Sequence, residues 1–346
     1  MLNSLSLPIL LLIFALAAAV VWLAGIRLST TTDVLSKRFK LGEALGGIIV
    51  LAIVTNLPEI AITISASLHN KVELAIGNLL GGIALQTVVL VVLDAFGVGK
   101  KATLSSQQSS LTPVLEGILV VAMLAIVVMG HQLPSSLIFD RITPASLLLI
   151  ATWIIGVYLI GKAAKGLPWQ LTQPITSPLK ENPAAPNQRS TALTILMFSA
   201  AATATLLGGL ALEVSGDAMS SKLGMNGVLF GATVLAAATA LPEVSTGLAA
   251  VKLKDYSLAV SDILGGNAFL PVLLALATLV SGKAVLPTAQ KTDIYLTGLG
   301  MLVTVVYLYG FVFRPKRQIA RMGLDSFVVL IIYLVGTVGL FMIAKK

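Results

Sequence analysis

Residues 47–68 read GIIVLAIVTNLPEIAITISASL, an apolar run that is interrupted at 55–59 by TNLPE. A second run at 227–251, GVLFGATVLAAATALPEVSTGLAAV, is interrupted in the same way by TALPE, 184 positions later. Each run has the roughly 20 apolar residues that a helix needs to cross a bilayer. A proline and an ionisable carboxylate are both costly at that depth and usually serve a function there. The repeated Leu-Pro-Glu motif therefore predicts a functional site inside a membrane.

The composition of the 346-residue chain is that of a polytopic membrane protein. The chain is 57% hydrophobic and 11% charged, with a mean hydropathy of +0.97. A soluble domain of this size carries far more charge on its surface. The net charge of +8 comes from basic residues scattered between the apolar runs, which favours contact with the lipid bilayer over binding of nucleic acid. No obligate protein partner is indicated.

Ten apolar runs predict an all-α fold with ten transmembrane helices. They lie at 5–27, 44–68, 72–97, 111–130, 145–164, 191–212, 226–251, 256–281, 291–313 and 324–343. Residues 166–189, between the fifth and sixth runs, contain five prolines and little that packs, which is typical of a flexible linker. We therefore divide the chain into a first five-helix repeat (1–165), a cytoplasmic linker (166–190) and a second five-helix repeat (191–346).

The basic residues set the expected orientation. The loops after the odd-numbered runs hold 16 of the 23 Lys and Arg residues, and the other side holds 7. Because cytoplasmic loops are enriched in Lys and Arg, we expect both termini outside and the linker in the cytoplasm. Each half has an odd number of spans, so the second half enters the membrane inverted. The offset also aligns VELAIGNLLGGIALQ (72–86) with YSLAVSDILGGNAFL (256–270), and inverted repeats are typical of secondary transporters.

Proline gives each motif its first chemical property. Within a helix it lacks the N–H that would bond to the carbonyl four residues earlier. Pro58 therefore frees the carbonyl of Val54, and Pro242 frees that of Ala238. A free carbonyl is expensive in hydrocarbon unless another group satisfies it, and a desolvated cation is one such group.

The glutamates give each motif its second property. Glu59 and Glu243 lie near the middle of their spans, and Thr55 and Thr239 lie four residues earlier on the same helical face. Carboxylates, hydroxyls and carbonyls together form a hard-oxygen site suited to Ca²⁺, or to Na⁺ and related ions. The alternative is a structural role, with protonated and hydrogen-bonded glutamates in two kinked helices. The absence of Lys and Arg deep in any span favours a mobile cation or a proton as counter-charge.

Polar residues also interrupt the two spans that follow the motifs. Asn78 and Gln86 lie in the third span, and Asp262 and Asn267 lie in the eighth. Asp262 is a third candidate carboxylate of the site, and a hydrated position near the helix end is the alternative. Glu116, about five residues inside the fourth span, either lies at a hydrated helix end or lines an ion path.

The third and eighth spans also contain two glycine pairs, Gly81–Gly82 and Gly265–Gly266. Small residues allow helices to approach closely in a membrane. We expect both pairs to let the kinked helices come close, and packing alone would be enough to explain them.

At this point the sequence resembles a known family. TNLPEIAITISASLHNKVELAIGNLLGG (55–82) and TALPEVSTGLAAVKLKDYSLAVSDILGGN (239–267) are similar to the two alpha repeats of the cation/calcium antiporter superfamily, which includes the sodium/calcium exchangers. The motifs cover about 60 residues, and the ten-span inverted topology extends the resemblance to the whole chain. It implies that Glu59 and Glu243 are the central cation-binding residues. It also implies that Thr55 and Thr239 coordinate the ion.

The chain departs from the family pattern at several polar positions. Where the family has serine, asparagine or another polar residue, this chain has Asn56, Gln86, Ala240, Gly82, Gly266, Ile83 and Leu270. Asn56 and Gln86 keep a side-chain oxygen and stay candidate ligands, and Asn267 matches the family's asparagine. In the sodium/calcium exchangers the lost hydroxyls help to form the sodium sites, so their absence weakens sodium coupling more than cation binding. We hypothesise that Asp262 supplies a displaced carboxylate.

The sequence thus predicts a secondary-active antiporter that exchanges Ca²⁺ for Na⁺ or H⁺ by alternating access, with inorganic cations as its partners and no cofactor. The alternative is a non-transporting cation-binding sensor or a degenerate exchanger paralogue. An intramembrane enzyme is disfavoured because the chain has no cysteine, and its two histidines, His69 and His131, lie in predicted loops. The linker is too short for the calcium-sensing domain of animal exchangers. We expect the chain in a prokaryotic cytoplasmic membrane.

Overall fold

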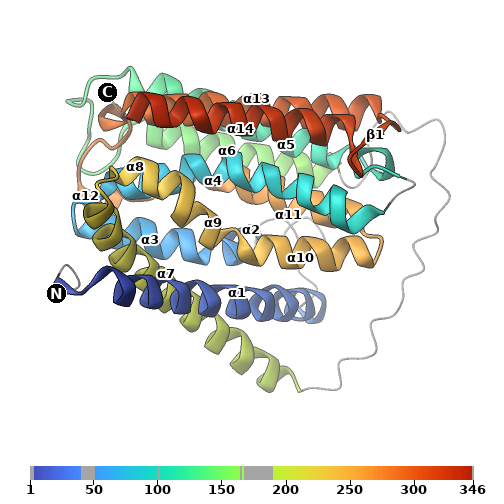
Figure 1. The fold of residues 1–346 in the computed structure, drawn as a ribbon, viewed down its shortest axis with the longest axis horizontal. Coiled ribbons are helices and arrows are strands. Elements are labelled where there is room, and N and C mark those ends of the chain that lie inside the picture. Colours follow the sequence, from blue (N-terminus) through green and yellow to red (C-terminus); the bar gives the residue numbers. More distant parts are fainter. Residues whose placement is uncertain are drawn as a thin grey trace.

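A computed structural model describes residues 4–39, 51–99, 102–108, 110–163, 166 and 190–344. Nearly all of the predicted linker and the first residues of the second predicted span, 44–50, lie outside the described residues. Most helices run along the long axis of the molecule, whereas α7 (Thr191–Leu223) crosses it obliquely, and the two ends of the chain lie at the same end of the bundle (Figure 1).

Long and short α-helices account for most of the described chain. They are α1 (Leu7–Arg38), α2 (Leu51–Thr55), α3 (Leu57–Leu68), α4 (Val72–Val92), α5 (Thr112–His131), α6 (Pro144–Ala163), α7 (Thr191–Leu223), α8 (Gly227–Phe230), α9 (Ala236–Thr239), α10 (Leu241–Lys252), α11 (Tyr256–Phe269), α12 (Val272–Ser281), α13 (Lys291–Phe313) and α14 (Leu324–Ala344). Two π-helical turns, η3 (Leu93–Val98) and η5 (Gly231–Leu235), continue α4 and α8, and two 3₁₀ turns occupy η4 (Ser105–Gln107) and η6 (Leu286–Thr288).

A two-residue β-hairpin departs from the all-α prediction. Strands β1 (Gln318–Ile319) and β2 (Met322–Gly323) pair antiparallel between α13 and α14. Ala320 and Arg321 between them have φ values of 50° and 71°. Positive φ at both central residues is the signature of the tight turn that matches the twist of paired strands.

Eight helices in the described part of the chain are long and apolar enough to cross a membrane. They correspond to predicted spans 1, 3, 4, 5, 6, 8, 9 and 10. A ninth span is formed if α8–α9 and α10, which meet at a bend of 41°, are counted as one. The predicted second span ends in the 12-residue α3, and because residues 44–50 are outside the described chain, ten spans remain a prediction.

Two helices are longer than the sequence predicted. The first was expected to end at 27 and ends at Arg38, and the sixth was expected to end at 212 and ends at Leu223. Polar residues end the apolar runs earlier, but their hydroxyls find acceptors inside the helix, so these residues are tolerated within it. Thr31, for example, donates to the carbonyl of Arg27 at 2.8 Å.

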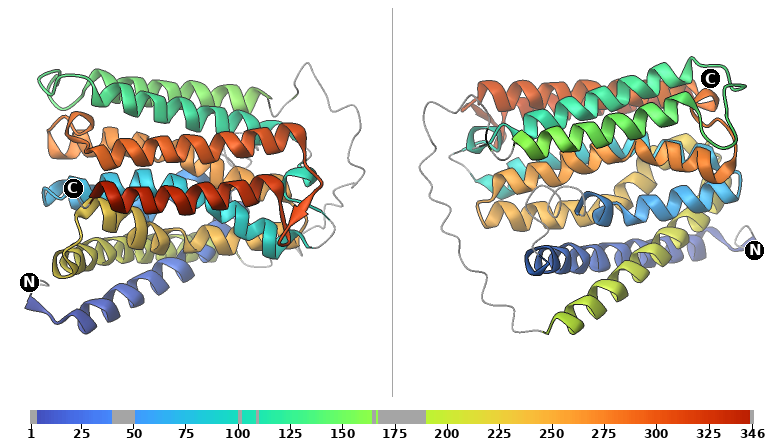
Figure 2. Two further views of the ribbon diagram at one scale, coloured as in Figure 1. Left: turned by 45° about the horizontal axis from the view of Figure 1, so that its top comes forward. Right: turned by 180° about the vertical axis from the view of Figure 1, so that it is seen from behind.

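The core of the bundle is built around α4 and the α11–α12 pair. In the most apolar stretch of each of these two segments, 78% of the residues are buried. In α14 only 17% are buried, so α14 lies on the outside of the bundle. Helices α1 and α7 pack together along one side, and α5, α6, α13 and α14 lie on the other (Figures 1 and 2). The broken helices α2–α3 and α8–α10 lie between these groups.

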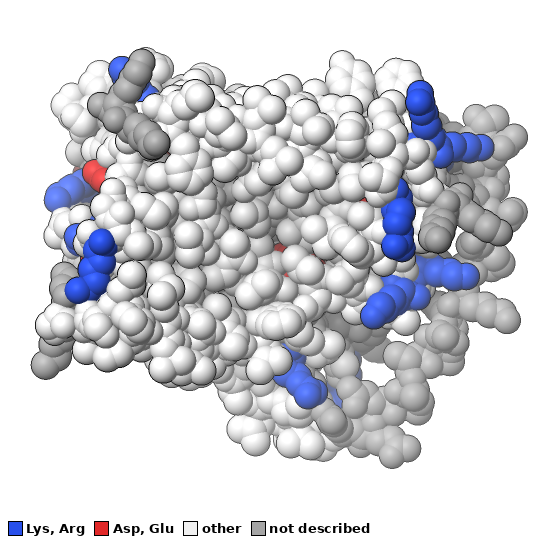
Figure 3. Space-filling model, in the orientation of Figure 1, with Lys and Arg blue, Asp and Glu red and all other residues white. Residues whose placement is uncertain are grey.

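The charged surface agrees with a membrane protein. On the face shown in Figure 3, most Lys and Arg side chains gather toward the two ends of the molecule, and few charged atoms are visible in the broad region between them. Many large apolar side chains on the outer helices are exposed, such as Leu334 on α14 and Ile154 on α6. Such a surface suits contact with lipid tails.

Candidate cation-binding site

The site begins with two helices that are broken at the predicted motifs. Helix α2 ends at Thr55 and α3 begins at Leu57, while α9 ends at Thr239 and α10 begins at Leu241. The prolines lie in the first turns of α3 and α10. A proline is tolerated there because the first turn of a helix needs no N–H from it. The motif therefore ends one helix and starts the next.

Glu59 and Glu243 occupy the first turns of these two new helices and are 1% and 3% exposed. Both carboxylate oxygens of Glu59 and Oε2 of Glu243 are buried and accept no hydrogen bond from the described residues. The two carboxylates are close enough to repel each other. The partial positive charge of a helix N-terminus favours a carboxylate. No Lys or Arg of the described residues acts on either glutamate, so the pair is suited to sharing a cation.

Hydroxyl and amide groups lie around the two breaks. Thr239 lies beside Glu59, and its hydroxyl donates to the carbonyl of Ala236 at 3.2 Å. Thr55 and Asn56, at the first break, are both buried. Asn56 Nδ2 lies 3.2 Å from the position that a Cβ on Gly266 would occupy, so its side chain rests against α11. These predicted ligands are thus buried at the breaks.

The amides of α4 and α11 are buried as well. Both polar side-chain atoms of Asn78 and the Nε2 of Gln86 have no hydrogen-bond partner among the described residues. Asn267 Nδ2 donates to the carbonyl of Ile83 at 3.3 Å and to the Thr87 hydroxyl at 3.1 Å. Its amide oxygen has no partner among the described residues. Asn267 therefore ties α11 to α4 and leaves one oxygen available.

Asp262 lies to one side of the glutamate pair. Its Oδ2 accepts a 3.0 Å hydrogen bond from Thr246, while its buried Oδ1 has no partner among the described residues. Its charge acts on Glu243. Among the described residues, no three acidic or histidine side chains are grouped closely enough to hold one metal ion together. A single site with all three carboxylates therefore stays a prediction.

The glycine pairs differ from one another in their packing. A Cβ on Gly81 would collide with Ala232, so α4 and the π-helical turn η5 touch here through their backbones. A Cβ on Gly82 would meet only Leu270, at an ordinary 3.7 Å. Gly265 differs from the expectation of close packing, because a Cβ there would meet no atom within 4 Å. It faces open space beside α5 and α6, as described below.

Two glycines that sequence reasoning missed bring α1 and α7 onto the broken helices. A Cβ on Gly25 of α1 would lie 2.7 Å from the Pro242 ring, and a Cβ on Gly209 of α7 would lie 2.9 Å from the Pro58 carbonyl oxygen. The two glycines are 184 positions apart, as are the two prolines. Because the Leu-Pro-Glu motifs repeat at this offset, a search for glycines at the same offset would have found them.

Side chains that follow the second motif were also missed. Trp22 Nε1 of α1 donates to the Ser245 hydroxyl of α10 at 2.5 Å, and the next residue, Thr246, binds Asp262. Both hydroxyls lie within one turn of Glu243. Their position directly after the motif was the only sequence signal for them.

Fold and site together define an integral membrane protein with a candidate cation site between two broken helices. Residues 9–162 and 192–342 match the profile of the family described as sodium/calcium exchanger protein. Because these two stretches make up most of the chain, the chain belongs to the sodium/calcium exchanger family. The resemblance seen in the two motifs is thereby confirmed.

Two relatives from bacteria are similar over most of the chain. Inner membrane protein YrbG of Escherichia coli (strain K12) is 24% identical over 282 residues, which is 81% of this chain and 82% of YrbG. The putative antiporter CaxA of Alkalimonas amylolytica is 23% identical over 272 residues, which is 75% of this chain and 77% of CaxA.

Solved structures share the fold at low sequence identity. The H⁺/Ca²⁺ exchanger CAX superposes with a TM-score of 0.63 at 14% identity, covering 97% of this chain and 88% of that one. The sodium–calcium exchanger NCX_Mj, soaked with 2.5 mM Na⁺ and 0.1 mM Ca²⁺, gives a TM-score of 0.59 at 18% identity, covering 95% of this chain and 98% of that one. These likenesses show that the exchanger fold extends over nearly the whole chain.

Proposed function

We propose that this protein is a secondary-active antiporter that exchanges Ca²⁺ for Na⁺ or H⁺ at a site between its two broken helices. One observation carries the proposal. Glu59 and Glu243 are both buried, their charges are close enough to repel each other, and three of their four carboxylate oxygens accept no hydrogen bond from the described residues. A buried carboxylate pair is unfavourable unless a counter-charge compensates it, and a hard divalent cation prefers oxygen ligands.

The comparisons support the choice of ion. NCX_Mj is named as a sodium–calcium exchanger and CAX as an H⁺/Ca²⁺ exchanger, while CaxA is a putative antiporter. We extend the exchange of Ca²⁺ to this chain. The missing hydroxyls at Ala240, Gly82 and Gly266 leave fewer ligands for Na⁺. The experiment below identifies the counter-ion.

Several neighbouring groups complete the proposed oxygen site. The candidate ligands besides the glutamate pair are Thr55, Thr239, Asn56, Asn78, Gln86, Asn267 and Asp262. The breaks at Pro58 and Pro242 also release backbone carbonyls close to the glutamates. Ca²⁺ takes about 6–8 oxygen ligands, which two carboxylates alone do not provide.

We further propose that ten helices form two inverted repeats, 1–165 and 191–346, around this site. A hydrogen bond between residues 184 positions apart, from Asn267 to the Ile83 carbonyl, supports the arrangement. So does the reciprocal packing of α1 on Pro242 and of α7 on Pro58. We place the linker in the cytoplasm and both termini outside, in a prokaryotic cytoplasmic membrane. YrbG is itself an inner membrane protein.

In this proposal the two ions compete for one site that opens to each side in turn. A cation that binds between α3 and α10 neutralises Glu59 and Glu243, and its release toward the other side leaves the carboxylates for the counter-ion. Exchange follows because the charged pair is unfavourable without either ion in the low-polarity interior.

The test is ⁴⁵Ca²⁺ flux into proteoliposomes under an imposed Na⁺ gradient and, separately, under an imposed pH gradient. We expect flux under one of the gradients, which names the counter-ion, and loss of flux in Glu59→Gln and Glu243→Gln. Glu73→Gln is the matched control, because Glu73 is an exposed carboxylate at the start of α4.

Two results would reject the proposal. Flux that persists in both site variants would show that the glutamate pair does not carry the ion. Ca²⁺ binding without flux under either gradient would favour the alternative, a non-transporting cation-binding protein, for which the lost hydroxyls are the motivating observation.

A further inference from the structure

A second acidic pair lies next to the proposed site, between α5 and α11. Glu116 of α5 is 1% exposed. It is close enough to Asp262 of α11 for the two charges to repel, and the side chain of Ser261 lies near it. Asp262 in turn acts on Glu243. The four carboxylates thus form a series that leads from Glu59 outward to Glu116.

The oxygen atoms of this second pair lack partners. Both carboxylate oxygens of Glu116 and the Oδ1 of Asp262 are buried and accept no hydrogen bond from the described residues. The other oxygen of Asp262 is held by Thr246 at 3.0 Å, which fixes the orientation of that carboxylate. Burying unpartnered carboxylate oxygens is costly, so each of them requires an explanation.

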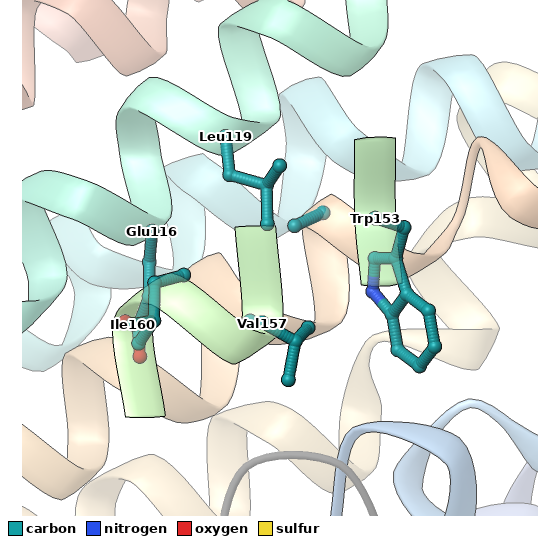
Figure 4. A pocket seen from close by; sticks show the side chains of 7 residues that line it. Glu116, Leu119, Trp153, Val157 and Ile160 are labelled. Atoms are coloured by element: carbon teal, nitrogen blue, oxygen red, sulfur yellow. The ribbon is translucent and has the colours of Figure 1, made fainter. Parts of the chain in front are cut away.

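A small pocket opens onto Glu116. It is lined by Leu119 of α5, by Trp153, Val157 and Ile160 of α6, and by Gly265 and Ala268 of α11. In Figure 4 the labelled side chains run from Glu116 beside Ile160, past Leu119 and Val157, to Trp153. Gly265 leaves the α11 side of this pocket open. The one ionisable lining residue, Glu116, therefore has space beside it.

We propose that Glu116, the free oxygen of Asp262 and the Ser261 hydroxyl form a second binding site for a divalent cation, beside the Glu59–Glu243 site. In this inference Asp262 binds the outer ion instead of completing the central site. Two carboxylates match the charge of one divalent ion. Glu116, Asp262 and Ser261 together offer three carboxylate oxygens and one hydroxyl. Ca²⁺ completes its coordination with water when the protein supplies fewer than about 6 ligands. This inference rests on the proposed function, because the same ion would occupy both sites.

The total charge of the four carboxylates favours two bound divalent ions rather than one. A single divalent cation compensates Glu59 and Glu243 and leaves Asp262 and Glu116 uncompensated. In the part of the chain that the structure describes, no three acidic side chains are grouped around one point, which agrees with two separate pairs. Gly265, expected to pack closely, instead leaves room beside Glu116.

The first test counts bound ions by equilibrium dialysis of ⁴⁵Ca²⁺ against the purified full-length protein in detergent. We expect two ions per chain in the wild type and one in Glu116→Gln. Glu73→Gln should keep both ions. Glu59→Gln should keep the outer ion, because Glu59 lies at the far end of the series.

The second test locates the outer ion without altering its ligands. Tb³⁺ prefers hard oxygen ligands as Ca²⁺ does, and it emits when a nearby tryptophan is excited. Trp153 lines the same pocket as Glu116, whereas Trp22 contacts α10 next to the central motif. We expect Trp153→Phe to remove one part of the sensitised emission and Trp22→Phe to remove another, with Ca²⁺ displacing both.

The outcomes separate this inference from the proposed function. One ion per chain in both wild type and Glu116→Gln, with emission unchanged in Trp153→Phe, would overturn the second site and leave the proposed function intact. No bound Ca²⁺ in the wild type would overturn both. If Glu116→Gln does not fold, the emission lost or kept in Trp153→Phe decides the question.

Discussion

Gly81 and Gly265 stand at equivalent positions of the two glycine pairs, yet the structure predicts opposite responses to the same substitution. In Gly81→Ala the new methyl group would collide with the Cα and Cβ of Ala232 and would lie 2.9 Å from its carbonyl oxygen. Alanine has no side-chain rotation with which to relieve the overlap, so α4 and η5 must move apart. In Gly265→Ala the methyl group would meet no atom within 4 Å.

The magnitude follows from comparing the two variants. Both replace a helical glycine, and each gains about 0.5–1 kcal/mol of helix propensity. That term cancels in the comparison. What remains is the overpacking at Gly81, which typically costs about 1–3 kcal/mol. We therefore expect Gly81→Ala to be less stable than Gly265→Ala by this amount.

Thermal unfolding in detergent, followed by tryptophan fluorescence, measures the difference. The expected gap in melting temperature is roughly 2–8 °C. Equal melting temperatures would refute the reasoning, because they would mean that α4 and η5 are not in backbone contact at Gly81. Gly265→Ala that is much less stable than the wild type would contradict the open space beside α11.

Three further predictions concern single contacts. Thr246→Val removes the 3.0 Å hydrogen bond that orients Asp262, and we expect Ca²⁺ to bind about 10-fold more weakly in ⁴⁵Ca²⁺ dialysis; unchanged affinity would argue against a role for Asp262. Ser65→Ala removes the 2.8 Å hydrogen bond to buried Glu213, and we expect a loss of about 1–3 kcal/mol in thermal stability; a loss below about 0.5 kcal/mol would show that Glu213 has another partner. Pro242→Ala restores an N–H at the second break, and we expect at least a 10-fold loss of Ca²⁺ flux in a folded protein, whereas wild-type flux would show that the break is dispensable.

Much of the fold could be predicted because it depends on local sequence. An apolar run of about 20 residues has few alternatives to a membrane helix. The breaks at Pro58 and Pro242 could also be predicted, since proline cannot continue a helix through its own missing N–H. The lengths of α1 and α7 could not be predicted from the apolar pattern. Polar residues such as Thr31 end the apolar run, but their hydroxyls bond inside the helix, so the helix extends beyond the run.

The candidate site was only partly predictable, since it depends on which side chains meet. The motif indicated that Glu59 and Glu243 are central, and in the structure both are buried and close enough for their charges to repel. The environment of Glu116 was left open by the sequence because burial at a helix end depends on the neighbouring helices. The packing of Gly265 was mispredicted for the same reason. Its partner helix is set by the tertiary arrangement, which the pattern of small residues does not contain.

The central claim is that one site around Glu59 and Glu243 carries Ca²⁺ across the membrane. Counterflow tests it most directly, because it needs no assumption about the counter-ion. Proteoliposomes loaded with unlabelled Ca²⁺ are diluted into a trace of ⁴⁵Ca²⁺, and accumulation of label is followed over time. We predict transient accumulation with the wild type and with Glu73→Gln, and none with Glu59→Gln or Glu243→Gln. A wild type that binds Ca²⁺ but accumulates no label, or a Glu59→Gln variant that accumulates it normally, would contradict the account.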